Sequence, residues 1–232
     1  MTSCVALLGG SFDPVHDGHV ALARLFVEQL QPTELRVLPA RPWQKAALQA
    51  SDEDRVAMLE LAFRDAGLAA TIDRREIDSG KPTYTAETLR GLRAELGPEV
   101  SIVFLMGADQ LQRLDSWRDW RELFELANIG VAARPGYRLE QDAMPPAVAE
   151  EIARRLAPPG QVRNTPSGLV CLAHTLAVDI SATQVREALQ REGAAGADSG
   201  HVPDGHVPED APTAYLSRVV LDYIQQHNLY RS

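Results

Sequence analysis

The sequence predicts an α/β fold in which helices cover both faces of a doubly wound, mostly parallel sheet. Short apolar runs alternate with helical patterns along the chain, which is typical of successive strand–helix–strand units. The clearest strand, over 100–106, is apolar except at its second residue. Such a run is expected for a strand that helices cover on both faces. Crossovers between parallel strands of one sheet are right-handed, so the predicted topology is a Rossmann-like one.

The remaining elements follow from local signals along the chain. Ser51 is a favourable N-cap, and the acidic residues 52–54 complement the dipole of the helix that follows it. The pair Gly97-Pro98 ends another helix. The predicted strands cover 5–8, 35–38, 70–73, 100–106, 129–133 and 169–172. Besides the helix after Ser51, the predicted helices cover 17–30, 83–96, 108–114, 119–126, 181–190 and 212–227.

The 232 residues fit a single domain. We expect residues 1–178 to form the α/β core and 179–232 to form a C-terminal helical part. Residues 140–166 are rich in proline and alanine around a short helical pattern. Residues 191–212 are rich in glycine and proline and contain the near-duplicate HVPDGHVPED, which predicts a mobile surface loop.

Composition excludes several classes of protein. Cys4 and Cys171 give neither a disulfide framework nor a CxxC metal pattern, which favours a reduced, cytoplasmic setting. No apolar run approaches the ~18 residues that a membrane span needs. The formal net charge is -9, and no basic stripe is present, which disfavours a nucleic-acid partner. An acidic protein can still bind nucleotides where a few cations and helix N-termini converge.

The first chemical motif is GGSFDPVHDGHV at residues 9–20, where the first strand gives way to a helix. Gly9 and Gly10 let the backbone approach a phosphate because no Cβ intrudes. His16 and His19 are three residues apart, so both lie on one face of the first helical turn and can donate to phosphate oxygens. Taken alone, the string also fits a turn with structural histidines or, weakly, a metal-binding pair.

The second motif is ISATQVR at residues 180–186, at the start of a predicted helix. Ser181 and Gln184 fit a capping box, which an ordinary well-capped helix would also explain. Capping does not explain Thr183 and Arg186 on the same first turns. A helix N-terminus that carries serine, threonine and arginine is a favourable receptor for polyphosphate oxygens.

Together these motifs resemble those of a known superfamily. The first resembles the HxGH signature of the nucleotidyltransferases, at His16, Gly18 and His19, and the second resembles their ISxTxxR-like element. Further segments resemble the nicotinate-nucleotide adenylyltransferases: GKPTYTAETL (80–89), LMGADQLQRLDSW (105–117), ARPGY (133–137) and VLDYIQQHNLY (220–230). The resemblance covers nearly the whole chain in the family's order. It implies transfer of the adenylyl group of ATP to nicotinate mononucleotide, which gives deamido-NAD (nicotinate adenine dinucleotide) and pyrophosphate in NAD biosynthesis.

The resemblance also implies roles for individual residues. The catalytic residues it implies are His16, His19 and Arg186. The ATP-binding residues it implies are Gly9, Gly10, Ser11, Phe12, Lys45, Gly107, Asp109, Ile180, Ser181 and Thr183. The residues it implies for nicotinate mononucleotide are Tyr84, Thr85, Trp117 and Arg134. In this assignment Asp109 accepts hydrogen bonds from ribose hydroxyls and Trp117 stacks on the nicotinate ring.

Each of these residues also has an ordinary structural interpretation. Tyr84 and Thr85 fit the first turn of any helix, and a tryptophan such as Trp117 is more often part of the core. Asp109 fits a helix N-terminal acid, and residues 134–136 fit a plain turn after a strand. The residues alone leave these alternatives open.

The chain departs from the family in the loop after the second strand. The family often carries Pro-Pro-His-Lys or Pro-Pro-His-Arg there, with the histidine and the base near the phosphates. This chain has Pro42, Trp43, Gln44 and Lys45. Lys45 retains the cation, whereas Gln44 is neutral at every accessible pH.

The expected chemistry needs no general base. The 5′-phosphate of the mononucleotide, with its second pKa near 6, is mostly dianionic at neutral pH and attacks the α-phosphorus of ATP in line. Catalysis then consists of positioning and of neutralising the leaving pyrophosphate, with Mg²⁺ bound to the phosphates and no metal site in the protein itself. Two other functions stay open: nicotinamide mononucleotide as the preferred acceptor, and a catalytically silent nucleotide sensor. The sequence also leaves a monomer and a homo-oligomer open.

Overall fold

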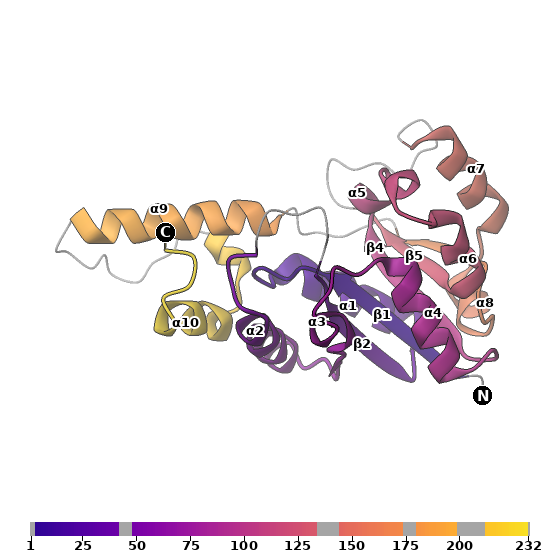
Figure 1. Cartoon of the computed structure of the whole chain (residues 1–232), viewed down its shortest axis with the longest axis horizontal. Helices are drawn as coiled ribbons and strands as arrows, with labels where there is room; N and C mark the ends of the chain where they lie inside the picture. Colours follow the sequence, from indigo (N-terminus) through magenta and orange to yellow (C-terminus); the bar gives the residue numbers. More distant parts are fainter. Residues whose placement is uncertain (1–2, 42–47, 134–143, 174–179, 199–211, 232) are drawn as a thin grey trace.

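The computed structural model describes residues 3–41, 48–133, 144–173, 180–198 and 212–231 (Figure 1). Its strands form one parallel sheet of six strands in the order β3-β2-β1-β4-β5-β6. The strands are β1 (Cys4–Gly10), β2 (Glu34–Pro39), β3 (Thr71–Ile72), β4 (Ser101–Gly107), β5 (Asn128–Ala132) and β6 (Val170–Ala173). The order of strands reverses between β1 and β4. In open α/β sheets, ligands bind beyond the carboxyl ends of the strands at such a reversal.

Helices connect the strands and cover the sheet. The α-helices are α1 (Asp17–Leu30), α2 (Asp52–Asp65), α3 (Arg75–Asp78), α4 (Thr85–Leu96), α5 (Ala108–Leu111), α6 (Leu123–Leu126), α7 (Pro146–Arg155), α8 (Pro159–Arg163), α9 (Ala182–Asp198) and α10 (Arg218–Gln226). Short 3₁₀ turns are η1 (Leu114–Ser116), η2 (Trp120–Glu122) and η4 (Pro212–Tyr215). This arrangement confirms the predicted α/β fold with a parallel sheet.

Two apolar cores lie on the two faces of the sheet. In β1, Ala6 and Leu8 belong to one core together with Phe26 of α1. Leu7, which points to the opposite face, belongs to the other core together with Leu89 of α4. Because side chains alternate along a strand, one continuous apolar run fills both cores.

Helix boundaries follow the predicted signals where those signals are strong. The side chain of Ser51 accepts a hydrogen bond from the backbone N–H of Asp54 at 3.1 Å, which caps α2. Gly97, with a φ of 87°, ends α4 in the left-handed region that favours glycine. The predicted helix over 83–96 begins later, because Tyr84 is extended and serves as its N-cap.

Several predicted segments differ from the structure. Helix α9 continues to Asp198, so the prediction of a loop from residue 191 was wrong for residues 191–198. Alanines 194, 195 and 197 favour helix strongly enough to outweigh two glycines. The predicted helix over 212–227 is divided into η4 and α10 at Ser217, the N-cap of α10. The loop predicted from 199 to 211 lies outside the described residues.

Two further helices were predicted longer and more regular than they are. The segment 108–114 forms α5 and continues into the separate turn η1, and 119–126 begins as η2 before α6. The helix α3 was not predicted, since four residues are too short for a periodic pattern. The strands β1 to β6 lie within about two residues of their predicted ranges, which is the usual uncertainty of boundaries.

The C-terminal part packs beside the N-terminal half of the chain. Figure 1 shows α10 next to α2, and α9 extending along the same side of the molecule. Leu221 and Ile224 of α10 join the core that contains Met58 and Leu59 of α2. The division at residue 178 into a core and a helical part stays a prediction.

The helices and the two cysteines of the structure can be compared with what the composition predicts. Within the described ranges, no helix is both long and apolar enough to cross a membrane. Cys4 and Cys171 are free thiols buried in the core. Burial raises the pKa of Cys171 to about 12, so this thiol stays protonated at neutral pH.

Candidate active site

Two adjoining cavities open at the carboxyl ends of β1 and β4, where the strand order reverses. The first has a volume of about 440 Å³ and the second about 240 Å³. Their common wall is formed by Gly9, Gly10, Ser11, Phe104, Gln110 and Trp117. A compound bound in one cavity therefore lies directly beside a compound bound in the other.

Both motifs of the sequence line the first cavity. Its polar lining residues include Ser11, Asp13, His16, His19, Gln49, Asp109, Gln110, Ser181, Thr183 and Arg186. The start of α1 and the start of α9, far apart in sequence, thus face one space. This is the juxtaposition on which the sequence-based function depends.

The two histidines are held in a fixed relation at the start of α1. His16 is the N-cap of this helix, and its backbone N–H donates to Nδ1 of His19 at 3.2 Å. The imidazole centroids lie 3.8 Å apart. A ring nitrogen that accepts a hydrogen bond carries no hydrogen, so neutral His19 carries its proton on Nε2. That nitrogen is a donor for an anionic ligand.

Gly18 lets the two helix starts approach each other. A Cβ at this position would lie 3.1 Å from the imidazole of His16 and 3.4 Å from Cγ2 of Ile180. The first distance is tighter than ordinary van der Waals contact, so any side chain here would displace the imidazole. The glycine between the histidines therefore leaves the imidazole of His16 undisturbed where the start of α1 packs against Ile180.

Arg186 lies on the second turn of α9 and is oriented by two acceptors. Its Nη1 donates to the backbone carbonyl of Asp13 at 2.5 Å, and its Nη2 donates to Oγ1 of Thr183 at 3.2 Å. Ser181 and Gln184 form the predicted capping box, with the backbone N–H of Ser181 donating to Oε1 of Gln184 at 2.9 Å. The two hydrogen bonds of Arg186 hold its guanidinium against the loop that follows β1.

The second cavity lies at the first turn of α4. Tyr84 is the N-cap of this helix and Thr85 its first residue, and both line the cavity. Trp117, from the wall shared with the first cavity, also lines it, and its ring packs nearly perpendicular to that of Phe104 at a centroid distance of 6.2 Å. The guanidinium of Arg118 lies 4.7 Å from the centroid of the Tyr84 ring. An aromatic wall, a helix N-terminus and a cation together suit a flat anionic ring.

Glu76 of α3 lies at the back of the second cavity. Its carboxylate is buried and accepts hydrogen bonds from two threonine hydroxyls, Thr83 at 2.6 Å and Thr88 at 2.7 Å. These bonds connect α3 to both sides of the turn that carries Tyr84. Glu76 thus holds the wall of the cavity in place.

Comparison with known proteins agrees with this geometry. A family model described as cytidylyltransferase-like matches residues 7–188. A probable nicotinate-nucleotide adenylyltransferase of Herminiimonas arsenicoxydans is 52% identical over 100% of this chain and 99% of its own length. The chain belongs to the nicotinate-nucleotide adenylyltransferase family. A similarly named protein of Laribacter hongkongensis is 43% identical over 98% of this chain and 94% of its own length.

Solved structures support the fold of this adenylyltransferase. The structure of Plasmodium falciparum nicotinic acid mononucleotide adenylyltransferase complexed with NaAD has a TM-score of 0.69. The alignment covers 98% of this chain and 97% of that chain, at 16% identity. A putative nicotinate-nucleotide adenylyltransferase from Vibrio parahaemolyticus has a TM-score of 0.59 at 14% identity. At such low identity the likeness concerns the Rossmann-like fold alone.

The structure places most of the predicted site residues at the two cavities of the adenylyltransferase. Gly107 and Asp109 line the first cavity at the end of β4. Phe12 and Ile180 are buried behind the cavity wall and do not line it. Lys45 and Arg134, as well as Gln44, lie outside the described residues. The roles of all these residues in binding and catalysis stay predictions.

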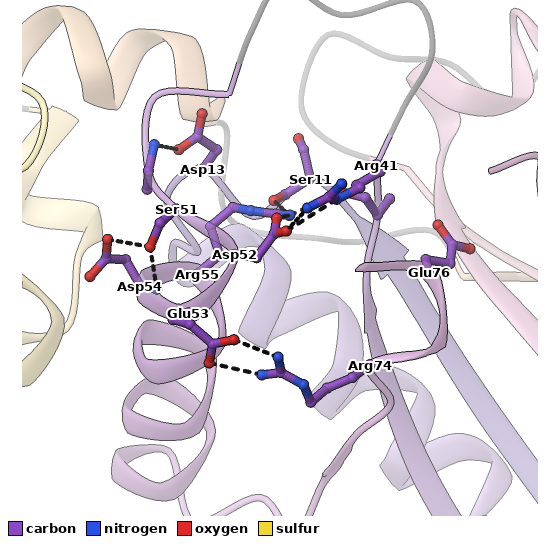
Figure 2. A network of polar contacts seen from close by, with 12 residues as sticks. Ser11, Asp13, Arg41, Ser51, Asp52, Glu53, Asp54, Arg55, Arg74 and Glu76 are labelled. Carbon is purple, nitrogen blue, oxygen red and sulfur yellow. Dashed lines mark hydrogen bonds and ion pairs between the residues drawn. The ribbon is translucent and has the colours of Figure 1, made fainter. Parts of the chain in front are cut away.

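A buried arginine that the sequence analysis missed supports the loop after β1. The side chain of Arg55 in α2 is fully buried, and its Nη1 donates to the carbonyls of Ser11 at 2.6 Å and Ala40 at 3.0 Å (Figure 2). Its Nη2 donates to Asp52 at 2.6 Å, and Asp52 also accepts from Arg41. Burial alone would raise the pKa of Asp52, but the hydrogen bonds from Arg41 and Arg55 outweigh it and hold that pKa below its ordinary value.

Asp13 lines the first cavity and is a second residue of the site that the sequence analysis did not predict. Its carboxylate accepts the backbone N–H groups of Gln49 at 2.9 Å and Ala50 at 3.0 Å. It also accepts the hydroxyl of Tyr230 at 2.7 Å. Asp13 stands inside the first motif, but an aspartate before a proline reads as an ordinary turn residue, and its partners are distant in sequence.

The described residues contain no group of three or more His, Cys, Asp or Glu side chains that could hold a metal ion. A magnesium ion that arrives with ATP needs no such group, because phosphate oxygens and water supply most of its ligands. Mg²⁺ as part of the nucleotide substrate stays a prediction.

Proposed function

We propose that the enzyme transfers the adenylyl group of ATP to nicotinate mononucleotide, giving nicotinate adenine dinucleotide and pyrophosphate. The observation that carries this proposal is the common wall of the two cavities, formed by the end of β1, Phe104, Gln110 and Trp117. A donor in the larger cavity and an acceptor in the smaller one would meet at Gly10 and Ser11. The names of the relatives from Herminiimonas arsenicoxydans and Laribacter hongkongensis support the same reaction.

ATP would occupy the first cavity. Its phosphates would lie against the backbone of residues 9–11 and accept hydrogen bonds from His16, His19 and Arg186. The dipoles of α1 and α9 add to this positive environment, since both helices begin at the cavity. The adenosine would extend along the end of β4, where Asp109 can accept from ribose hydroxyls.

Nicotinate mononucleotide would occupy the second cavity. Its ring would lie against Trp117, and its carboxylate would point to the first turn of α4, at Tyr84 and Thr85. We expect the helix N-terminus and the guanidinium of Arg118, which also pairs with Glu87 at 3.6 Å, to favour a carboxylate over a neutral amide by about tenfold in affinity. The other charged group of this cavity, the carboxylate of Glu76, is already engaged by the hydroxyls of Thr83 and Thr88. This charge environment supports nicotinate mononucleotide as the acceptor ahead of nicotinamide mononucleotide.

The chemical step would be a direct in-line displacement. An oxygen of the mononucleotide phosphate forms a bond to the α-phosphorus of ATP, and the bond from that phosphorus to the α–β bridging oxygen breaks. The electron pair leaves with pyrophosphate, and the nucleophile has no proton to lose because it is already dianionic. His16, His19, Arg186 and Lys45 would neutralise the charge on pyrophosphate, together with Mg²⁺ bound to ATP. Arg134 would contact the mononucleotide.

A pyrophosphate-release assay with MgATP and either mononucleotide at equal concentration tests this proposal. We expect release with nicotinate mononucleotide, at a kcat/KM about tenfold or more above that for nicotinamide mononucleotide. Tight ATP binding without pyrophosphate release from either acceptor would identify a nucleotide sensor and refute the proposal. Preference for the amide would refute the assignment of the acid.

We also expect the enzyme to act in the cytoplasm and on small molecules. The two buried free thiols suit a reducing compartment. The net charge of -9 disfavours binding to nucleic acid. A salt-dependent association with nucleic acid in a filter-binding assay would contradict this expectation.

A further inference from the structure

A tyrosine near the C-terminus contacts the loop that would hold the ATP phosphates. We propose that Tyr230 is a positioning residue for the ATP half of the site, acting through Asp13 on Arg186 and Gln49. This inference rests on the proposed function, because it assigns the phosphates of ATP to the first cavity.

The contact between Tyr230 and Asp13 is buried and spans almost the whole chain. The hydroxyl of Tyr230 donates to Oδ1 of Asp13 at 2.7 Å across 217 residues of sequence. The tyrosine is 5% exposed and packs in the core with Val220, Leu221 and Ile224 of α10. Burial, and then the negative charge of Asp13, raise the pKa of Tyr230, so the hydroxyl stays a donor at every physiological pH.

The backbone of Tyr230 has a conformation that needs support. Its φ is 61°, in the left-handed region that bulky side chains rarely adopt. Such a conformation is strained and persists where surrounding contacts fix it. The hydrogen bond to Asp13 and the buried ring are contacts of that kind.

Asp13 connects this tyrosine to two residues that line the first cavity. Its carboxylate accepts the N–H of Gln49, and its carbonyl accepts Nη1 of Arg186 at 2.5 Å. Gln49, Arg186 and Asp13 all line the first cavity, and none of them lines the second. A displacement of Asp13 would therefore act first on groups that line the ATP cavity alone.

Tyr230→Phe tests the proposal because it removes only the hydroxyl. A buried carboxylate that loses a donor moves toward other donors or water, since an unmet charge is costly. We expect kcat/KM for ATP to fall about tenfold or more, and the KM for nicotinate mononucleotide to stay within about twofold. The dissociation constant of MgATP, measured by calorimetry without an acceptor, should rise in parallel.

Tyr223→Phe is the matched control. Tyr223 belongs to α10, and its hydroxyl donates to a carboxylate of α2, Asp54, at 3.0 Å. This variant removes the same kind of bond from the same part of the chain, but neither Tyr223 nor Asp54 lines either of the two cavities described above. We expect a lower melting temperature with unchanged kinetic constants for both substrates.

The outcomes separate this proposal from the proposed function. Equal kinetics for Tyr230→Phe and Tyr223→Phe, or equal losses for ATP and the mononucleotide, would overturn the role of Tyr230. If the wild-type chain releases no pyrophosphate, the proposed function fails, and the calorimetric ATP affinities still decide the role of Tyr230. If Tyr230→Phe does not fold, Asp13→Asn, which keeps an acceptor without its charge, should weaken MgATP binding in the same direction, and unchanged binding would overturn the proposal.

Discussion

The backbone N–H of His16 donates to Nδ1 of His19 at 3.2 Å, so the start of α1 determines which nitrogen of His19 faces a ligand. With Nδ1 engaged by the backbone, the remaining nitrogen, Nε2, carries the hydrogen of the neutral ring. A donor fixed before the substrate arrives needs no reorganisation during the reaction. The helix cap and the proposed catalysis thus depend on the same side chain.

Replacing His19 by asparagine should separate these two roles. In His19→Asn the side-chain oxygen can still accept the N–H of His16, but the donor at Nε2 is lost. We expect kcat for pyrophosphate release to fall about a hundredfold or more, as for other transition-state donors, with a melting temperature close to that of the wild type. Near-normal turnover of the purified variant would remove His19 from catalysis.

Trp117 should affect the mononucleotide far more than ATP. Trp117→Ala removes the aromatic wall of the second cavity, so the KM for nicotinate mononucleotide should rise about tenfold or more in steady-state assays. Trp120→Ala serves as the control, because Trp120 packs against Phe124 in the core and lines neither cavity. It should lower stability without changing the ratio of the two KM values. Equal increases for both substrates in Trp117→Ala would place this residue outside the nicotinate pocket.

Glu76 should affect binding of the mononucleotide in the second cavity through its hydrogen bonds with Thr83 and Thr88. Glu76→Ala leaves the hydroxyls of Thr83 and Thr88 without their shared acceptor and loosens the turn before α4. We expect the KM for the mononucleotide to rise several-fold, about fivefold, while the KM for ATP changes little. Glu125→Ala, at an exposed position of α6, should change neither value. A selective effect on ATP would contradict the assignment of the cavities.

The buried arginine network predicts a dependence of stability on pH. Hydrogen bonds from Arg41 and Arg55 hold the pKa of Asp52 below its ordinary value of 3.8, despite burial. The stabilisation is therefore fully present above pH 3.8 and is lost as the pH falls through the lower pKa of the folded state. Asp52→Asn should lower the free energy of unfolding by about 1–3 kcal/mol at pH 6, with a smaller difference near pH 3.

Urea unfolding at several pH values measures this difference. Asp222→Asn is the control, because Asp222 pairs with Arg218 on the exposed face of α10 and such pairs contribute little. A difference between wild type and Asp52→Asn that grows as the pH falls would show that the charge of Asp52 does not stabilise the fold.

Local patterns in the sequence predicted the sheet and the two motifs that line the first cavity, since those signals lie within a few residues. The strand at 100–106 and the string from Gly9 to Val20 are of this kind. The contacts that support the site join distant segments, and no local pattern reports them. Arg55 reads as one more charged residue of an amphipathic helix, although it is fully buried against Ser11.

The central claim is that the mononucleotide phosphate attacks the α-phosphorus of ATP, and isotope labelling tests it most directly. Nicotinate mononucleotide with ¹⁸O in its phosphate should be incubated with MgATP and the enzyme. The ¹⁸O content of both products is then measured by mass spectrometry. We predict that all the label is found in nicotinate adenine dinucleotide and none in pyrophosphate. Pyrophosphate that contains ¹⁸O, or a dinucleotide that has lost ¹⁸O, would contradict the proposed reaction.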